Sequence, residues 1–244
     1  MEYVAWLSYG KDSMYMLKII DREKLHLDRI LTVDTFATPR IPAVLPDMIE
    51  FQRKADDKIK NLFGIEVEHL STGKNFQDEF YRKKTKGNHI GQIIGFPSAQ
   101  CNWCNNILKQ GVFKQFQNKE NYTQYVGICA NEPKRYLRLQ GTNKIAPLYE
   151  KGITEIQCYR WCIENDLLAP TYKTGTRDGC WFCYNKNKKH FEMIRKNYPE
   201  YWELLLQWDK DSPYYFFRDG TSLHDLDNEL KLKDEYLRSR KKLF

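Results

Sequence analysis

SYGKDS, residues 8–13, separates an apolar run from a helical pattern in EYVAWLSYGKDSMYMLKII, residues 2–20. The run 3–7 (YVAWL) predicts a short buried strand, and apolar side chains at Met14, Leu17 and Ile20 predict a helix over 12–22 with one buried face. A strand, a short glycine-containing turn and a helix start direct backbone N–H groups towards one point, where an anion is favoured. The order of these elements therefore predicts a phosphate site at the turn.

The side chains of this turn also suit an anion. Lys11 adds a mobile positive charge, and Ser8 and Ser13 add hydroxyl donors. Asp12 can cap the helix or help to hold Mg²⁺. The spacing GxxxxGK[ST] of a P-loop is absent, which excludes that kind of nucleotide site. The structural alternative is an ordinary strand-to-helix turn capped by serine or aspartate.

The pattern continues beyond the turn as alternating strands and helices. Residues 29–35 and 65–70 predict strands, and 47–63 predict a helix ended by Gly64. This order implies a parallel sheet with helices on both faces, an α/β fold. Residues 122–129 (YTQYVGIC) predict a fourth strand, and Thr154 to Gln157 form a capping box that opens a helix to about Asn165.

Two regions are less regular. Residues 72–100 are polar and basic without a clear period, which predicts a long functional loop with helical pieces. From 187 onward the chain is helix-rich, basic and aromatic. We therefore expect a nucleotide-binding domain over 1–185 and a helical C-terminal extension over 186–244.

Composition limits the class of protein. The 244 residues contain no apolar run of about 18, and MEYVAWL lacks the features of a signal peptide, so we expect a cytoplasmic protein without a membrane partner. The net charge is +7, with basic clusters at 82–86, 186–196 and 238–242. A nucleic-acid partner is permitted, and a solvated basic surface is the alternative.

Several stretches together resemble one family. SYGKDS is similar to the SGGKDS loop of the PP-loop ATP pyrophosphatases, and it lies directly after the first strand, as in that family. Val33-Asp34-Thr35 resembles the family's "DTG"-like end of the second strand, and residues 127–135 resemble its G-x-R-x-x-E-S-x-R stretch. The block 147–183 resembles the "PL…W…DVW…PLY…GCxxC" block of phosphoadenylyl-sulfate (PAPS) reductase-like members. The resemblance covers about residues 1 to 185.

The resemblance implies a fold of the adenine nucleotide alpha hydrolase type that binds ATP or a related nucleotide. It implies that Asp34 lies near the ribose or adenine and that Arg135 meets a substrate or phosphate anion, for which its forked guanidinium is suited. A surface ion pair with Glu132 is the alternative for Arg135. The residues implied to cradle the phosphates are Ser8, Gly10, Lys11, Asp12 and Ser13.

The sequence departs from the family at three places. Tyr9 replaces the first glycine of the loop, so we expect it to manage without a positive φ and to turn its ring out of the phosphate pocket. Cys129 stands where the family often has arginine, and a nearby cation could lower its pKa to give a nucleophilic thiolate; a small apolar filler is the alternative. The tail YLRSRKKLF lacks the terminal cysteine of PAPS and adenylyl-sulfate reductases.

Two CxxC pairs predict a metal site. Cys101 and Cys104 form one pair, and Cys180 and Cys183 form the other; each has a tryptophan between its cysteines. Four thiolates suit tetrahedral zinc or an iron–sulfur cluster, and two separate pairs of buried or redox cysteines are the alternative. The adenylyl-sulfate reductases hold a [4Fe–4S] cluster with similarly placed cysteines, which favours that cluster over Zn²⁺ here. The family's first pair is adjacent, whereas two residues intervene in this chain.

The remaining cysteines and histidines are weaker candidates for site residues. Cys158 and Cys162 share one face of the helix that Thr154 opens, which predicts core packing. His69 and His89 are isolated and are not selected as active-site groups.

We therefore predict a PP-loop ATPase with ATP and Mg²⁺ as cofactors. It would release pyrophosphate and adenylate a substrate for sulfur or amine transfer, with Lys11, Asp12, Cys129 and Arg135 as catalytic residues. A tRNA or DNA acceptor and a sulfur-donor protein are the expected partners. A sulfonucleotide reductase that uses Cys129 and a non-catalytic nucleotide- or nucleic-acid-binding module are the alternatives.

Overall fold

The computed structural model describes residues 1–117, 122–174 and 179–241. The chain divides into two compact units, each made of three separate segments. Unit 1 comprises Met1–Thr35, Val44–Gly73 and Ile107–Asp178, and unit 2 comprises Phe36–Ala43, Lys74–Asn106 and Gly179–Phe244.

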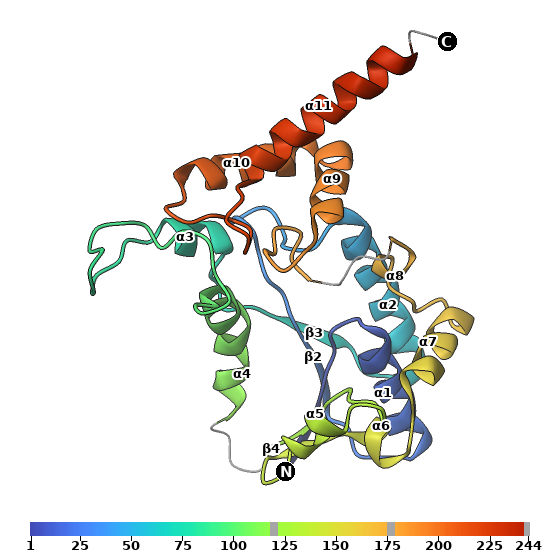
Figure 1. The fold of residues 1–244 in the computed structure, drawn as a ribbon. Helices are drawn as coiled ribbons and strands as arrows, with labels where there is room; N and C mark the ends of the chain where they lie inside the picture. Colours follow the sequence, from blue (N-terminus) through green and yellow to red (C-terminus); the bar gives the residue numbers. More distant parts are fainter. Residues whose placement is uncertain (118–121, 175–178, 242–244) are drawn as a thin grey trace. The chain divides into compact units, whose positions relative to one another are not determined.

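Unit 1 is built on a five-stranded sheet with the order β3-β2-β1-β4-β5, in which every neighbouring pair is parallel (Figure 1). Its strands are β1 (Glu2–Trp6), β2 (Arg29–Val33), β3 (Val67–Leu70), β4 (Tyr122–Tyr125) and β5 (Lys144–Ile145). Its helices are α1 (Lys11–Arg22), α2 (Pro46–Phe63), α4 (Gln110–Gln117), α5 (Pro133–Leu137), α6 (Pro147–Glu150), α7 (Glu155–Glu164) and α8 (Thr171–Thr174). The predicted α/β fold with a parallel sheet is confirmed.

Helices cover both faces of this sheet because successive strand residues point to opposite sides. Ala5 and Ile30 pack in a core shared with residues of α1, α2 and α7. Their neighbours Val4 and Leu31 pack on the other face against Val112 of α4. The strands are therefore buried on both sides, as their near-continuous apolar composition requires.

The element boundaries follow local signals in the sequence. Gly64 ends α2 in the left-handed conformation at φ +71°, as predicted. The capping box that opens α7 is also present, since the backbone N–H of Thr154 donates to Oε1 of Gln157 at 2.8 Å. The short elements β5, α5 and α6 were not predicted, and they are between two and five residues long.

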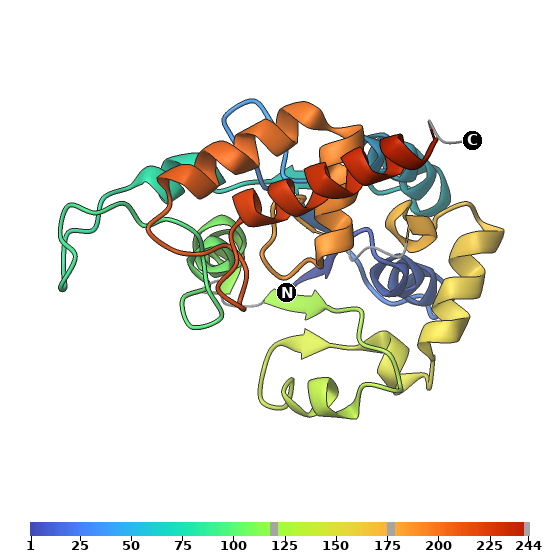
Figure 2. The same cartoon turned by 45° about the horizontal axis from the view of Figure 1, so that its top comes forward.

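Unit 2 contains α3 (Phe76–Tyr81), α9 (Lys188–Asn197), α10 (Pro199–Asp211) and α11 (Leu223–Lys241), and Figure 2 shows α11 beside α10. A π-helical turn, η1 (Asn105–Lys109), joins it to α4. The unit has an aromatic core. The ring of Phe76 lies 5.1 Å from Trp103, 4.4 Å from Phe182 and 5.0 Å from Trp208, measured between ring centroids. The predicted helix-rich C-terminal region is confirmed.

Among the helices of the described ranges, none is long and apolar enough to cross a bilayer.

Candidate functional site

A cavity of about 620 Å³ opens in unit 1 beyond the carboxyl ends of β1 and β4. These two strands are neighbours in the sheet, but the chain runs from β1 outward through β2 and β3 before it returns to β4. In open parallel sheets, ligands bind at such a switch in strand order. The lining residues are Trp6, Ser8, Gly10, Asp12, Ser13, Val126, Gly127, Ile128, Arg135, Arg138, Leu139, Lys144 and Tyr172.

The turn after β1 forms one wall of this cavity. The hydroxyl of Ser13 accepts a hydrogen bond from the backbone N–H of Ser8 at 3.1 Å and donates to the carbonyl of Gly10 at 3.0 Å. Gly10 is the residue before α1, so the first turn of this 12-residue helix begins at the cavity. The N–H groups and the dipole at a helix start favour an anion at such a point, although the N–H of Lys11 also donates to the hydroxyl of Tyr172 at 3.4 Å.

Tyr9 adopts a conformation that the sequence analysis did not predict. Its φ is +58°, so the expectation that it would avoid a positive φ was wrong. The left-handed region costs a residue with a Cβ about 1–2 kcal/mol. The ring does turn away from the phosphate side, as expected, and is 1% exposed in the core. Its hydroxyl donates to Oδ1 of Asp56 at 2.7 Å, and these contacts offset the backbone cost.

His69 connects this turn to two carboxylates. Its Nδ1 lies 3.0 Å from both oxygens of Asp34, its Nε2 lies 3.0 Å from Oδ2 of Asp56, and the Tyr9 hydroxyl lies 3.2 Å from Nε2. The hydrogen bonds to Asp34 and then Asp56 outweigh burial and raise the pKa of His69 to about 10. Burial and the hydrogen bond to Asp56 raise the pKa of Tyr9. At neutral pH the network therefore holds an imidazolium between two carboxylates.

Sequence reasoning set His69 aside because it is isolated. The available signal was its place at the end of the third strand, since parallel neighbouring strands bring His69 next to the end of β2. Asp34 follows β2 there, and both of its oxygens face His69. Asp34 is not among the described residues that line the cavity.

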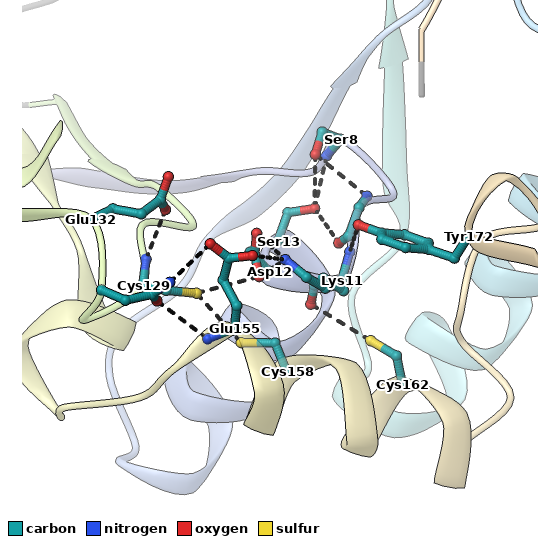
Figure 3. A network of polar contacts seen from close by, with 12 residues as sticks. Ser8, Lys11, Asp12, Ser13, Cys129, Glu132, Glu155, Cys158, Cys162 and Tyr172 are labelled. Carbon is teal, nitrogen blue, oxygen red and sulfur yellow. Dashed lines mark hydrogen bonds and ion pairs between the residues drawn. The ribbon is translucent and has the colours of Figure 1, made fainter. Parts of the chain in front are cut away.

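Lys11 lies beside the turn in a network of charges (Figure 3). Its Nζ is 2.9 Å from Oδ1 of Asp12 and 3.0 Å from Oε2 of Glu155, and its side chain is 12% exposed. Burial lowers the pKa of Lys11, but the hydrogen bonds to Asp12 and Glu155 outweigh it and raise the pKa overall. Lys11 is therefore a fixed cation at the start of α1, held by a carboxylate from α7.

Cys129 joins the same network, in a buried environment. Its Sγ lies 3.3 Å from Oδ1 of Asp12 and 3.6 Å from Sγ of Cys158, and the residue is fully buried. The sequence left two expectations for this thiol, a pKa lowered by a nearby cation or a small apolar filler, and the buried side chain fits the filler. The hydrogen bond with Cys158, burial and the charge of Asp12 raise the pKa of Cys129. The environment of Cys129 favours the neutral thiol.

Cys158 and Cys162 are fully buried, which confirms the prediction of core packing. We call Cys129, Cys158 and Cys162 the buried thiols. Among the described residues, Asp12, Cys129 and Cys158 are the group of three potential metal ligands whose ligand atoms all lie within 4.8 Å of one another. The contact between Cys129 and Cys158 was not predicted, because it depends on how α7 packs against the segment after β4.

Gly127 brings the segment after β4 against the start of α1. A Cβ at this position would lie 2.9 Å from the backbone nitrogen of Ser13 and 3.0 Å from the carbonyl carbon of Asp12. Both are backbone atoms and cannot move aside as a flexible side chain can. Only glycine therefore lets the two walls of the cavity meet at this distance.

Basic side chains also line the cavity. Arg135 lines the cavity, and its Nη1 also pairs with Oε1 of Glu132 at 2.5 Å, so the alternative of an ion pair is observed as well. Arg138 and Lys144 line it too, and the sequence analysis did not select them. An anion held by the turn would therefore face several cations.

The two CxxC pairs, whose cysteines we call the CxxC thiols, both belong to unit 2. Cys101 is exposed, and Cys104, Cys180 and Cys183 are partly exposed. Trp103 of the first pair and Phe182 of the second both contact the ring of Phe76, so one aromatic side chain connects the two motifs. In the described part of the chain, no three of the CxxC thiols have sulfur atoms that all lie within 4.8 Å of one another.

Comparisons with known proteins give one structural likeness to report. The chain is similar to the U34-tRNA thiolase NcsA from Methanococcus maripaludis, determined with its [4Fe–4S] cluster, at 16% sequence identity and a TM-score of 0.41. The match covers 69% of this chain and 58% of the thiolase chain. No protein-family model matches the chain, and no curated protein matches its sequence. The functional interpretation therefore rests on the geometry of the cavity and of the cysteines.

Proposed function

We propose that the protein is a PP-loop ATPase that cleaves ATP between the α and β phosphates. An acceptor oxygen would form a bond to the α-phosphorus while the bond to pyrophosphate breaks, and a sulfur or amine nucleophile would then displace AMP from the acceptor. The observation that carries the proposal is the SYGKDS turn at the start of α1, which opens into a cavity at the switch in strand order.

The residues of the cavity suggest how a triphosphate would lie. The first-turn N–H groups of α1 and the hydroxyls of Ser8 and Ser13 would hold phosphate oxygens. Arg135 of the cavity lining would stabilise the departing pyrophosphate, because fixed cations act most strongly on charge that develops in the reaction. Mg²⁺ would be held by Asp12 and would neutralise phosphate charge.

Lys11 has a conditional role in this proposal. Its ammonium pairs with Asp12 and Glu155. If Asp12 helped to hold Mg²⁺, Lys11 would keep its ion pair with Glu155 and would add positive charge at the start of α1. Glu155 would then act as the carboxylate that positions Lys11.

We propose that the CxxC thiols hold a [4Fe–4S] cluster, with Zn²⁺ as the alternative. The contacts of Phe76 with both motifs support a shared site. In addition, the indole N–H of Trp103 is buried without a partner among the described residues, and it lies between the two cysteines of its pair in the sequence. Thiolate or sulfide sulfur would accept that hydrogen bond. A cluster would supply sulfur-handling or electron-transfer chemistry, whereas zinc would stabilise the fold.

The proposed acceptor is a nucleic acid, tRNA or DNA, and a sulfur-donor protein would supply the second nucleophile. The net charge of +7 supports a polyanionic partner. The alternative of a sulfonucleotide reductase requires a nucleophilic thiol, and the raised pKa of Cys129 disfavours it for that role.

Nucleotide turnover tests the proposal directly. Anaerobically purified protein should release pyrophosphate and AMP from ATP when RNA or DNA is added, and Lys11→Ala should lower the rate by about 10²–10³-fold. Lys18→Ala is the matched control, since Lys18 is on the same helix with a 42% exposed side chain. Ser13→Ala should also slow the reaction. Unchanged turnover in both Lys11→Ala and Ser13→Ala would refute the assignment of the turn.

A further inference from the structure

A basic excursion of the chain follows α3 in unit 2. We call residues 82–95 (RKKTKGNHIGQIIG) the basic finger; it contains one arginine, three lysines and no acidic residue. Its two arms are joined by backbone hydrogen bonds, from Lys84 N to Gln92 O at 2.9 Å and from Ile94 N to Arg82 O at 2.8 Å. Figures 1 and 2 both show it extending away from α3. It is therefore a hairpin-like projection with defined pairing.

The base of the finger is fixed to the segment after α10. Gly95 has φ +71°, and a Cβ there would lie 2.7 Å from Cδ of Pro213. The Nζ of Lys84 donates to the hydroxyl of Tyr214 at 2.5 Å and lies 4.8 Å from the centre of its ring. These contacts hold the finger next to Tyr214 and Tyr215.

The charges of the finger are only partly compensated. Arg82 pairs with Glu79 at 2.8 Å, and Lys84 is held by Tyr214. Lys83 and Lys86 are exposed and make no ion pair among the described residues. Two such ammonium groups on a narrow projection favour a partner with regularly spaced negative charges.

Exposed aromatic rings lie next to the base of the finger, where Lys84 contacts Tyr214. Tyr215 is 68% exposed and Tyr214 is 44% exposed, although unit 2 buries most of its large aromatic side chains. Exposed tyrosine rings next to lysines are the combination on which unpaired nucleobases stack while the backbone phosphates are neutralised. Lipid headgroups supply negative charge but no bases, so they do not account for the aromatic half of this surface.

We propose that the basic finger and Tyr215 bind single-stranded nucleic acid, with phosphates on Lys83 and Lys86 and a base stacked on Tyr215. The inference deepens the proposed function by assigning a surface to its nucleic-acid partner. It rests on the acceptor part of that function and does not depend on the nucleotide cavity, since its residues all belong to unit 2.

Fluorescence anisotropy with a labelled single-stranded RNA and a DNA of the same sequence tests the proposal. For a Lys83→Gln, Lys86→Gln double variant, the slope of log K against log salt should become shallower by about 1.4, at about 0.7 for each phosphate that is no longer neutralised. Tyr215→Ala should weaken binding about 5- to 150-fold, the loss of one stacked base, and leave the salt slope unchanged. Thermal unfolding should match wild type for each variant.

Matched controls separate this surface from general charge. Lys24→Gln with Lys54→Gln removes two lysines of unit 1 whose side chains are 83% and 70% exposed, and Tyr236→Ala removes another tyrosine that is 60% exposed. Both controls should bind as wild type does. Oligonucleotide binding that is unaffected by the finger and Tyr215 variants would overturn the proposal. Anionic vesicles that compete with the oligonucleotide and depend on Lys83 and Lys86 but not on Tyr215 would overturn it as well. Lys11→Ala should still bind the oligonucleotide, so failure of the nucleotide site is distinguishable.

Discussion

The buried thiols of unit 1 and the CxxC thiols of unit 2 show how differently one chain uses the same side chain. The buried thiols pack within the core around α1 and α7, and the charge of Asp12 contributes to the raised pKa of Cys129. The CxxC thiols are exposed or partly exposed and come from two motifs that contact one aromatic ring. A neutral thiol in a packed core behaves as a small apolar group, whereas an accessible thiol can lose its proton to a metal.

The largest expected effect is on metal content. Cys180→Ser with Cys183→Ser should reduce bound iron or zinc to less than about a tenth of wild type, because a thiolate metal site contributes on the order of 10 kcal/mol to binding and folding. Metal analysis by mass spectrometry and the visible absorbance of anaerobic protein measure this. Cys129→Ser is the control and should keep its metal. If Cys129→Ser lost the metal and the Cys180→Ser, Cys183→Ser variant kept it, the metal would be assigned to Asp12, Cys129 and Cys158 instead.

Thiol reactivity should separate the two groups next. After chelation of metal at pH 8, iodoacetamide should alkylate the CxxC thiols at least about 100-fold faster than the buried thiols, because alkylation requires the thiolate. Burial raises the pKa of Cys162 to about 12, so little thiolate forms there. Peptide mass spectrometry over time gives the rates. Comparable rates in native protein would show that the core of unit 1 opens readily.

Gly127→Ala tests how closely the segment after β4 packs against the start of α1. The added Cβ would meet the backbone of Ser13 at 2.9 Å, so we expect a loss of about 1–3 kcal/mol in the free energy of unfolding and weaker nucleotide binding. Denaturant unfolding and a nucleotide titration measure the two effects. Gly141→Asn should be nearly neutral, because its site is open and asparagine tolerates the left-handed φ of +73°. Equal effects of the two substitutions on the free energy of unfolding would contradict the close approach of Gly127 to the backbone of Ser13.

The smallest effect concerns pH. The pKa of His69 is raised from its ordinary value of 6.5 to about 10 in the folded protein, so its contribution to stability is complete below about pH 6.5 and is lost as the pH rises towards 10. Its side chain is 37% exposed, so solvent screening reduces the contribution to about 1 kcal/mol.

His69→Gln should therefore flatten the fall in unfolding free energy between pH 6.5 and 10. Denaturant titrations at several pH values compare the variant with wild type. His89→Gln is the control, because His89 lies in the exposed basic finger. A variant whose stability falls with pH as steeply as that of wild type would show that the Asp34 and Asp56 contacts do not hold the imidazolium.

Local patterns were sufficient for much of the fold. The apolar run before Ser8, the glycine at 64 and the capping box at Thr154 each act over a few residues, and the strands and helices they predict are present. The parallel arrangement followed from the alternation of these elements. The two-residue strand β5 has no periodic signal, and it forms because Gln124 and Tyr125 offer it a partner.

The candidate site was less predictable, because its decisive contacts join distant residues. Tyr9 has a positive φ and a buried ring, and its hydroxyl donates a hydrogen bond to Asp56, which is 47 residues away. The pKa of Cys129 depends on Cys158 of α7, 29 residues away. Which residues form the turn could be predicted from the sequence, whereas the protonation of their neighbours depends on tertiary packing.

The interleaving of the two units has a consequence for synthesis of the chain. Phe76 of the unit 2 core contacts Trp208, and every residue of unit 1 that follows Gly73 is made between these two. At about 5–20 residues per second, Phe76 would leave the ribosome roughly 7–26 seconds before Trp208. Throughout that interval an aromatic cluster without its final partners is open to other chains. A chaperone that holds aromatic segments would therefore matter most to the yield of this protein between the synthesis of Phe76 and that of Trp208.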